Sequence, residues 1–117
     1  DMSVVAERDG QIQGWVSGYR LPNEPGTIFV WQIVVHKEAR GDGVGIALLN
    51  ALLALPAAAD VTRLKTTITP ANHASRALFK RFAQQRGLEA VKRPWFDSVA
   101  HFGCRHESET MFSIGPL

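Results

Sequence analysis

The chain has 117 residues, is 45% hydrophobic and 21% charged, and carries a formal net charge of +2. This length and composition fit one globular domain with a single core over residues 1–117. No apolar run approaches the roughly 20 residues of a membrane helix, residues 1–5 lack a signal-peptide pattern, and no basic run is interleaved with aromatic residues as in many nucleic-acid-binding proteins. The single cysteine, Cys104, excludes an internal disulfide and favours a reducing, cytoplasmic location.

Three strand-like runs occupy the first third of the chain. Residues 3–7 and 11–19 flank Arg8-Asp9-Gly10, and Asp-Gly between two such runs predicts a hairpin. The Pro, Asn and Gly residues within 21–26 predict a loop. Residues 27–35 are nearly continuously apolar and rich in β-branched side chains, which predicts a central strand covered on both faces.

Two helices and further strands follow. Residues 46–55 are apolar except for Asn50, which predicts a buried helix stopped by Pro56. Residues 61–69 read as a strand, and Asn72 is the expected N-cap of a second helix. That helix shows Ala74, Leu78 and Phe82 on one face, with Ser75 and Phe79 on its flank.

Gly87 is the expected end of the second helix. Residues 88–92 predict a short strand, 94–108 a long loop and 110–114 a last strand. The predicted order is therefore β-β-β-α-β-α-β-β. This order indicates an α/β (α+β) fold, in which helices flank a mixed central sheet that contains parallel strands.

The glycine-rich turn RGDGVG at 40–45, between a strand and a helix, is the most informative feature. Glycines permit positive φ, successive amides form an anion-binding nest, and a helix N-terminus adds unpaired N–H groups. Together they predict a pyrophosphate site. The turn lacks the Gly-Lys-Ser/Thr of a Walker loop and the G-x-G-x-x-G of a dinucleotide loop. An ordinary strand-to-helix turn is the alternative interpretation.

The pattern R-x-x-G-x-G, formed by Arg40, Gly43 and Gly45, resembles the coenzyme motif of the GNAT superfamily of acetyl-CoA-dependent N-acetyltransferases. Asn72-x-x-Ser75-x-x-Leu78-Phe79 is similar to that family's second coenzyme helix. The resemblance implies a GNAT acyl-CoA N-acyltransferase fold with acetyl-CoA as co-substrate. It also implies a coenzyme site formed by Ile33, Val34, Val35, Arg40, Gly41, Asp42, Gly43, Gly45, Ile46, Asn72, Ser75, Phe79 and Phe82.

Longer strings narrow the resemblance. VWQIVV at 30–35, TTITPANHASRALFKRFA at 66–83, YRLP at 19–22, FDSVAHF at 96–102 and HESE at 106–109 look like the diaminobutyrate acetyltransferases across nearly the whole chain. The resemblance implies acetyl transfer to the γ-amine of L-2,4-diaminobutyrate in ectoine biosynthesis, by a homodimer without a metal. The first strand and two helices usual in GNAT domains are absent, so the chain looks like the family's C-terminal two-thirds.

The acceptor carries two ammonium groups, and acidic residues are the natural partners for them. By resemblance we expect Trp31, Thr67, His106 and Glu109 in the substrate pocket, with Glu109 holding an ammonium. The base is left open between His106, Glu107 and a water chain. Many GNAT enzymes have a tyrosine where this chain has Phe79, which cannot protonate the departing thiolate.

Three alternatives stay open from the sequence. The acceptor could be another small amine or a peptide N-terminus, or the chain could bind the coenzyme without catalysis. His101, Cys104 and His106 could ligate a metal, but their spacing is not that of a structural zinc site, so we expect none.

Overall fold

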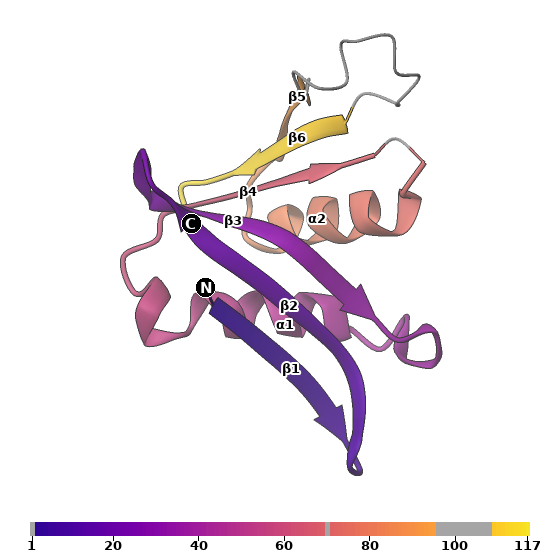
Figure 1. Ribbon diagram of the computed structural model, residues 1–117. Helices are drawn as coiled ribbons and strands as arrows, with labels where there is room; N and C mark the ends of the chain where they lie inside the picture. Colours follow the sequence, from indigo (N-terminus) through magenta and orange to yellow (C-terminus); the bar gives the residue numbers. More distant parts are fainter. Residues whose placement is uncertain (1, 70, 96–108) are drawn as a thin grey trace, which may run out of the picture.

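A single mixed sheet organises the chain, with the strand order β1-β2-β3-β4-β6-β5 (Figure 1). The computed structural model describes residues 2–69, 71–95 and 109–117. Within these residues only β3 and β4 pair in parallel, while the other neighbours are antiparallel. The elements are β1 (Met2–Arg8), β2 (Gln11–Leu21), β3 (Glu24–Val35), η1 (Lys37–Ala39), α1 (Val44–Leu53), η2 (Pro56–Ala58), β4 (Arg63–Ile68), α2 (His73–Gln85), β5 (Val91–Trp95) and β6 (Glu109–Ile114).

The predicted order of strands and helices is confirmed, but several boundaries differ. The loop predicted over 21–26 is only a tight turn, because Leu21 already pairs with Glu24 in the β2–β3 hairpin. β5 begins at Val91 and runs through Pro94 to Trp95. It pairs with β6 alone and forms a sheet edge, where a proline costs no ladder hydrogen bond.

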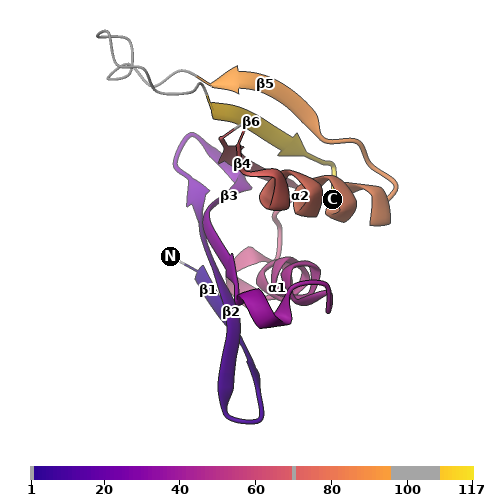
Figure 2. The ribbon, with the colours of Figure 1, turned by 90° about the vertical axis from the view of Figure 1, so that its right-hand side faces the viewer.

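Both helices pack on one face of the sheet (Figure 2). α1 contributes Leu48, Leu49 and Leu52 to the core, each at most 1% exposed, and contacts β1, β2 and β3. α2 contributes Phe79, Phe82 and Ala83 to the same core. Ala74, predicted to share one face of the helix with Leu78 and Phe82, is exposed, and Leu78 is only half-buried. The reason is that this stripe of the helix faces a cleft and not the sheet.

The ends of α2 follow the predicted capping. Asn72 Oδ1 accepts a hydrogen bond from the Ser75 amide at 3.1 Å, as an N-cap residue does. At the other end Gly87 has φ +70°. The Gly87 amide donates to the Gln84 carbonyl at 3.0 Å and the Leu88 amide donates to the Ala83 carbonyl at 2.9 Å. This pair of bonds is the Schellman motif, which fixes where the helix ends.

Among the described residues, no helix combines the length and apolar character that crossing a membrane would require.

Candidate active site

The parallel strands β3 and β4 diverge partway along their length. They pair only where residues 27–29 lie opposite residues 63–65. Just beyond, the Thr66 hydroxyl donates to the Val30 carbonyl at 2.8 Å, and no ladder pair of β3 with β4 follows within the described residues. On its other edge β3 stays paired with β2 up to Val35. The divergence, visible in Figure 1, therefore exposes one edge of β3 to a cleft.

A β-bulge lies at the start of this free edge. Ser17 of β2 is opposite Gln32, but the next residue, Gly18, is opposite Val30. Trp31 is therefore the extra residue of β3, and its side chain is 53% exposed despite the strand's central position. Bulges re-aim side chains beside functional sites. The predicted coverage of this strand on both faces is correspondingly incomplete from Trp31 onward.

The glycine turn places the N-terminus of α1 at the cleft, and the first amide groups of this helix have no acceptor within the described part of the chain. Gly41 has φ +91° and Gly43, the N-cap, has φ +77°, which are conformations that favour glycine. No side chain caps the helix, and among the described residues no acceptor takes the N–H groups of Val44, Gly45 and Ile46. Unpaired donors at the positive end of a helix dipole form a ready site for an anion.

α2 forms the opposite wall. Ala74, Ala77, Leu78 and Arg81 follow the i, i+3, i+4, i+7 spacing of one helical face, and all four line the cleft. The two helices approach each other where Gly45 meets Leu78. A Cβ on Gly45 would lie 2.8 Å from the Leu78 Cδ1, so only glycine leaves this gap unaltered.

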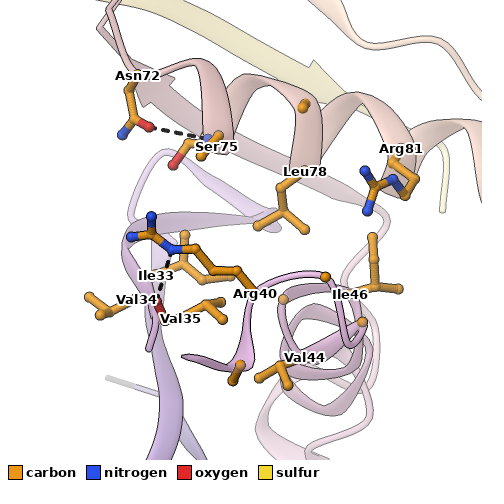
Figure 3. Close-up of a pocket in the computed structure, with 16 residues that line it drawn as sticks. Ile33, Val34, Val35, Arg40, Val44, Ile46, Asn72, Ser75, Leu78 and Arg81 are labelled. Carbon is orange, nitrogen blue, oxygen red and sulfur yellow. Dashed lines mark hydrogen bonds between the residues drawn. The ribbon is translucent and has the colours of Figure 1, made fainter. Parts of the chain in front are cut away.

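The cleft has a volume of about 460 Å³ and opens between β3, α1 and α2 (Figure 3). Its lining contains two arginines, Arg40 and Arg81, and no acidic residue. A second hollow of about 250 Å³ is lined by Trp31, Thr67 and Phe79 among others, and it shares Ile33, Asn72 and Ser75 with the larger cleft. The two hollows therefore meet at the free edge of β3.

The two charged side chains of the glycine turn, Arg40 and Asp42, have different partners. Arg40 turns back on the strand, and its Nε donates to the Val35 carbonyl at 3.4 Å (Figure 3). Asp42 does not line the cleft, and its carboxylate lies 3.8 Å from Arg8 in an exposed ion pair. An exposed pair of this kind contributes little to stability. The cleft therefore presents positive groups and unpaired amides among apolar side chains, with Asn72 and Ser75 as further polar residues.

The structure brings together most of the predicted coenzyme residues. Those on the larger cleft are Ile33, Val34, Val35, Arg40, Gly41, Gly43, Gly45, Ile46, Asn72 and Ser75, while Phe79 lines the smaller hollow. Asp42 and Phe82 line neither of the two hollows. Phe82 is 1% exposed in the core, with the Arg86 guanidinium 4.9 Å above its ring.

The predicted substrate residues are placed only in part. Trp31 and Thr67 line the smaller hollow. His106 and Glu107 lie outside the described residues, as do His101 and Cys104, and of Glu109 only the backbone in β6 is described. Arg81 and Leu78 also line the larger cleft but were not among the predicted site residues, although Leu78 is part of the quoted helix pattern and the helical period that starts at Ala74 leads to both of them.

Comparisons with known proteins agree with this geometry. The sequence model of the Acetyltransferase (GNAT) family matches residues 1–83. L-2,4-diaminobutyric acid acetyltransferase of Methylotuvimicrobium alcaliphilum is 41% identical over 117 residues, which are 100% of this chain and 68% of that protein. Its counterpart from Nocardia farcinica is 44% identical over 115 residues, 98% of this chain and 59% of that protein. The chain thus spans about two thirds of the first relative and less of the second.

A solved structure gives the same result. Diaminobutyrate acetyltransferase EctA from Paenibacillus lautus, in complex with its substrate L-2,4-diaminobutyric acid and coenzyme A, matches with a TM-score of 0.88 and 34% identity. The match covers 98% of this chain and 70% of that one. The fold, the cleft between its two helices and the sequence relationships agree, and the chain belongs to the diaminobutyrate acetyltransferases of the GNAT acetyltransferase family.

Proposed function

We propose that this protein transfers the acetyl group of acetyl-CoA to the γ-amine of L-2,4-diaminobutyrate. The observation that carries the proposal is the meeting of two hollows at the free edge of β3, one lined by unpaired amides and arginines and one by Trp31 and Thr67. A transferase needs such a junction, because the thioester of one substrate must meet the amine of the other. The relatives' names support this choice of acceptor.

The larger cleft is the proposed coenzyme site. The amides of Val44, Gly45 and Ile46 bind the diphosphate at the mouth of α1. The pantetheine arm then lies along Ile33, Val34 and Val35, whose strand edge has amide and carbonyl groups that β4 does not take. A backbone N–H near Val34 stabilises the oxyanion that develops when the amine attacks the thioester.

The smaller hollow is the proposed acceptor site, with Trp31 and Thr67 in its wall. The register supports a place for Glu109 at its rim. Thr110 lies opposite Ile68, which lines the hollow, and Glu109 is the residue before Thr110, at the start of β6. We assign to Glu109 an ammonium group of the acceptor, since a close carboxylate stabilises that charge.

The reaction needs a proton acceptor before the attack. An alkyl amine has a pKa of roughly 10.4, so near neutral pH only about one molecule in a thousand is the free base. A residue that holds an ammonium does not also deprotonate it readily, which leaves His106, Glu107 or a water as the base. Phe79 has no proton to donate, so another group or a water protonates the departing thiolate.

The proposal also covers the cellular location, the pathway and the oligomeric state of the enzyme. We place it in the cytoplasm, in ectoine biosynthesis, as a homodimer. The exposed apolar side chains of β1 and β2, Val5, Ile12, Trp15 and Tyr19, favour a sheet face that another surface covers. Light scattering on the purified protein measures the mass of the assembly.

The direct test is an assay of thiol release from acetyl-CoA with L-2,4-diaminobutyrate as acceptor, with the product identified by NMR. We expect acetylation at the γ-nitrogen and slower turnover with lysine, spermidine or a peptide amine. Equal or faster turnover of a peptide would show that the acceptor is different. Coenzyme binding without turnover of any amine would contradict the proposed catalysis.

A further inference from the structure

Arg81 stands out among the charged residues of α2 because it lines the coenzyme cleft and is exposed there. Within the part of the chain that the structure describes, it makes no ion pair and no hydrogen bond, unlike Arg86, which donates to Asn50 Oδ1 at 2.9 Å. Figure 3 shows its guanidinium across the cleft from Ile46, beyond Leu78 on the side away from Asn72. A guanidinium that faces a cleft in this way is available to an anionic ligand.

The positions of residues along the cleft indicate which part of the coenzyme lies near Arg81. Asn72 and Ser75 lie where the cleft meets the smaller hollow, which is the thioester end of the proposed coenzyme site. Arg81 is nine residues beyond Asn72 along α2, and at 1.5 Å per residue this corresponds to about 13.5 Å along the helix axis. The coenzyme's nucleotide end therefore lies at the Arg81 end of the cleft.

The diphosphate already has partners in the open amides at the mouth of α1. The coenzyme's remaining phosphate is the 3′-monoester on the ribose. A phosphate monoester carries a charge of about −1.5 to −2 at pH 7 and offers three acceptor oxygens. This charge and geometry match the fork of donors on an arginine.

We propose that Arg81 binds the 3′-phosphate of the coenzyme, and so makes the enzyme prefer CoA over its 3′-dephospho form. The inference rests on the proposed acetyl-CoA site and adds a residue that discriminates between two otherwise identical ligands. Arg81 is a binding residue for the nucleotide end and has no part in the chemistry at the thioester.

The test is calorimetric titration of the full chain with CoA and with 3′-dephospho-CoA. Arg81→Gln is the test variant, and Arg81→Lys retains the charge but not the fork. Lys80→Gln is the matched control, because Lys80 is the exposed neighbour on α2 that does not line the cleft and its loss changes the net charge equally. Substitution at exposed positions changes stability little, and a circular dichroism melt of each variant checks folding.

We expect the unaltered protein to prefer CoA by a factor on the order of ten, as one charge-assisted contact at a partly exposed site provides. Arg81→Gln should abolish this preference by weakening CoA binding alone, Arg81→Lys should restore part of it, and Lys80→Gln should leave it intact. An equal loss for both ligands would place Arg81 on the diphosphate and overturn the inference, as would no loss at all. If the unaltered protein binds neither ligand, the proposed coenzyme site itself fails.

Discussion

At the residue scale, single glycines decide the shape of the larger cleft. Gly43 adopts the left-handed conformation that lets α1 begin with its amides open, and Gly45 leaves room for Leu78 of the facing helix. These two glycines have different physical roles. The first sets the backbone path, whereas the second sets the distance between two helices.

Gly45→Ala should weaken CoA binding by roughly three- to tenfold, because the new Cβ at 2.8 Å from the Leu78 Cδ1 pushes a flexible side chain into the cleft. Titration calorimetry measures the change. The double variant Gly45→Ala/Leu78→Ala should recover much of the lost affinity, since the obstructing side chain is gone. Additive losses in the double variant would rule out the steric explanation.

At the residue scale, the sequence predicts the positions of some cleft residues but not of others. The motif residues Arg40, Gly43 and Gly45 all line the larger cleft, because backbone conformation there depends on local residue types. Phe82 could not be separated from Phe79 in this way. Both side chains are 1% exposed, and only the packed structure shows that Phe79 also lines a hollow, whereas Phe82 lines neither of the two hollows.

At the element scale, both ends of helix α2 are capped. Asn72 caps its N-terminus, and the Schellman motif at Gly87 caps its C-terminus. Its N-cap lies on the wall shared by both hollows. The cap therefore couples the stability of the helix to the shape of the site.

Replacement of Asn72 should separate these two roles. Asn72→Ala should lower the free energy of unfolding by about 1 kcal/mol, because the Ser75 amide loses its acceptor. Asn72→Asp should keep stability near that of the unaltered protein, yet weaken CoA binding by adding a carboxylate to a cleft that has no acidic residue. Urea unfolding and calorimetry measure the two quantities. If Asn72→Asp is as unstable as Asn72→Ala, the capping account is wrong.

Element order followed from the sequence, whereas element boundaries did not follow everywhere. Hydrophobic period and glycine signals indicated each strand and helix in its place. The β2–β3 turn was predicted too long, because cross-strand pairing of Leu21 with Glu24 overrides the loop composition of Pro22 and Asn23. The start of β5 was predicted too early for a similar reason, since its register is set by β6.

At the scale of the whole molecule, the parting of β3 from β4 creates the site. Pairing stops after residues 27–29, and the space beyond is closed by α1 on one side and α2 on the other. A right-handed βαβ connection brings the N-terminus of its helix to the carboxyl ends of parallel strands. The alternation of strands and helices indicated parallel strands, whereas the residue at which their pairing stops has no local sequence signature.

The central claim is that the amides at the mouth of α1 bind the coenzyme's diphosphate beside the free edge of β3. Backbone amide NMR spectra during titration test it most directly, with CoA as one ligand and pantetheine, which has no phosphate, as the other. The account predicts that the amide signals of Val44, Gly45 and Ile46 shift with CoA but not with pantetheine, while those of residues 33–35 shift with both. Unchanged signals at Val44, Gly45 and Ile46 in saturating CoA would contradict it.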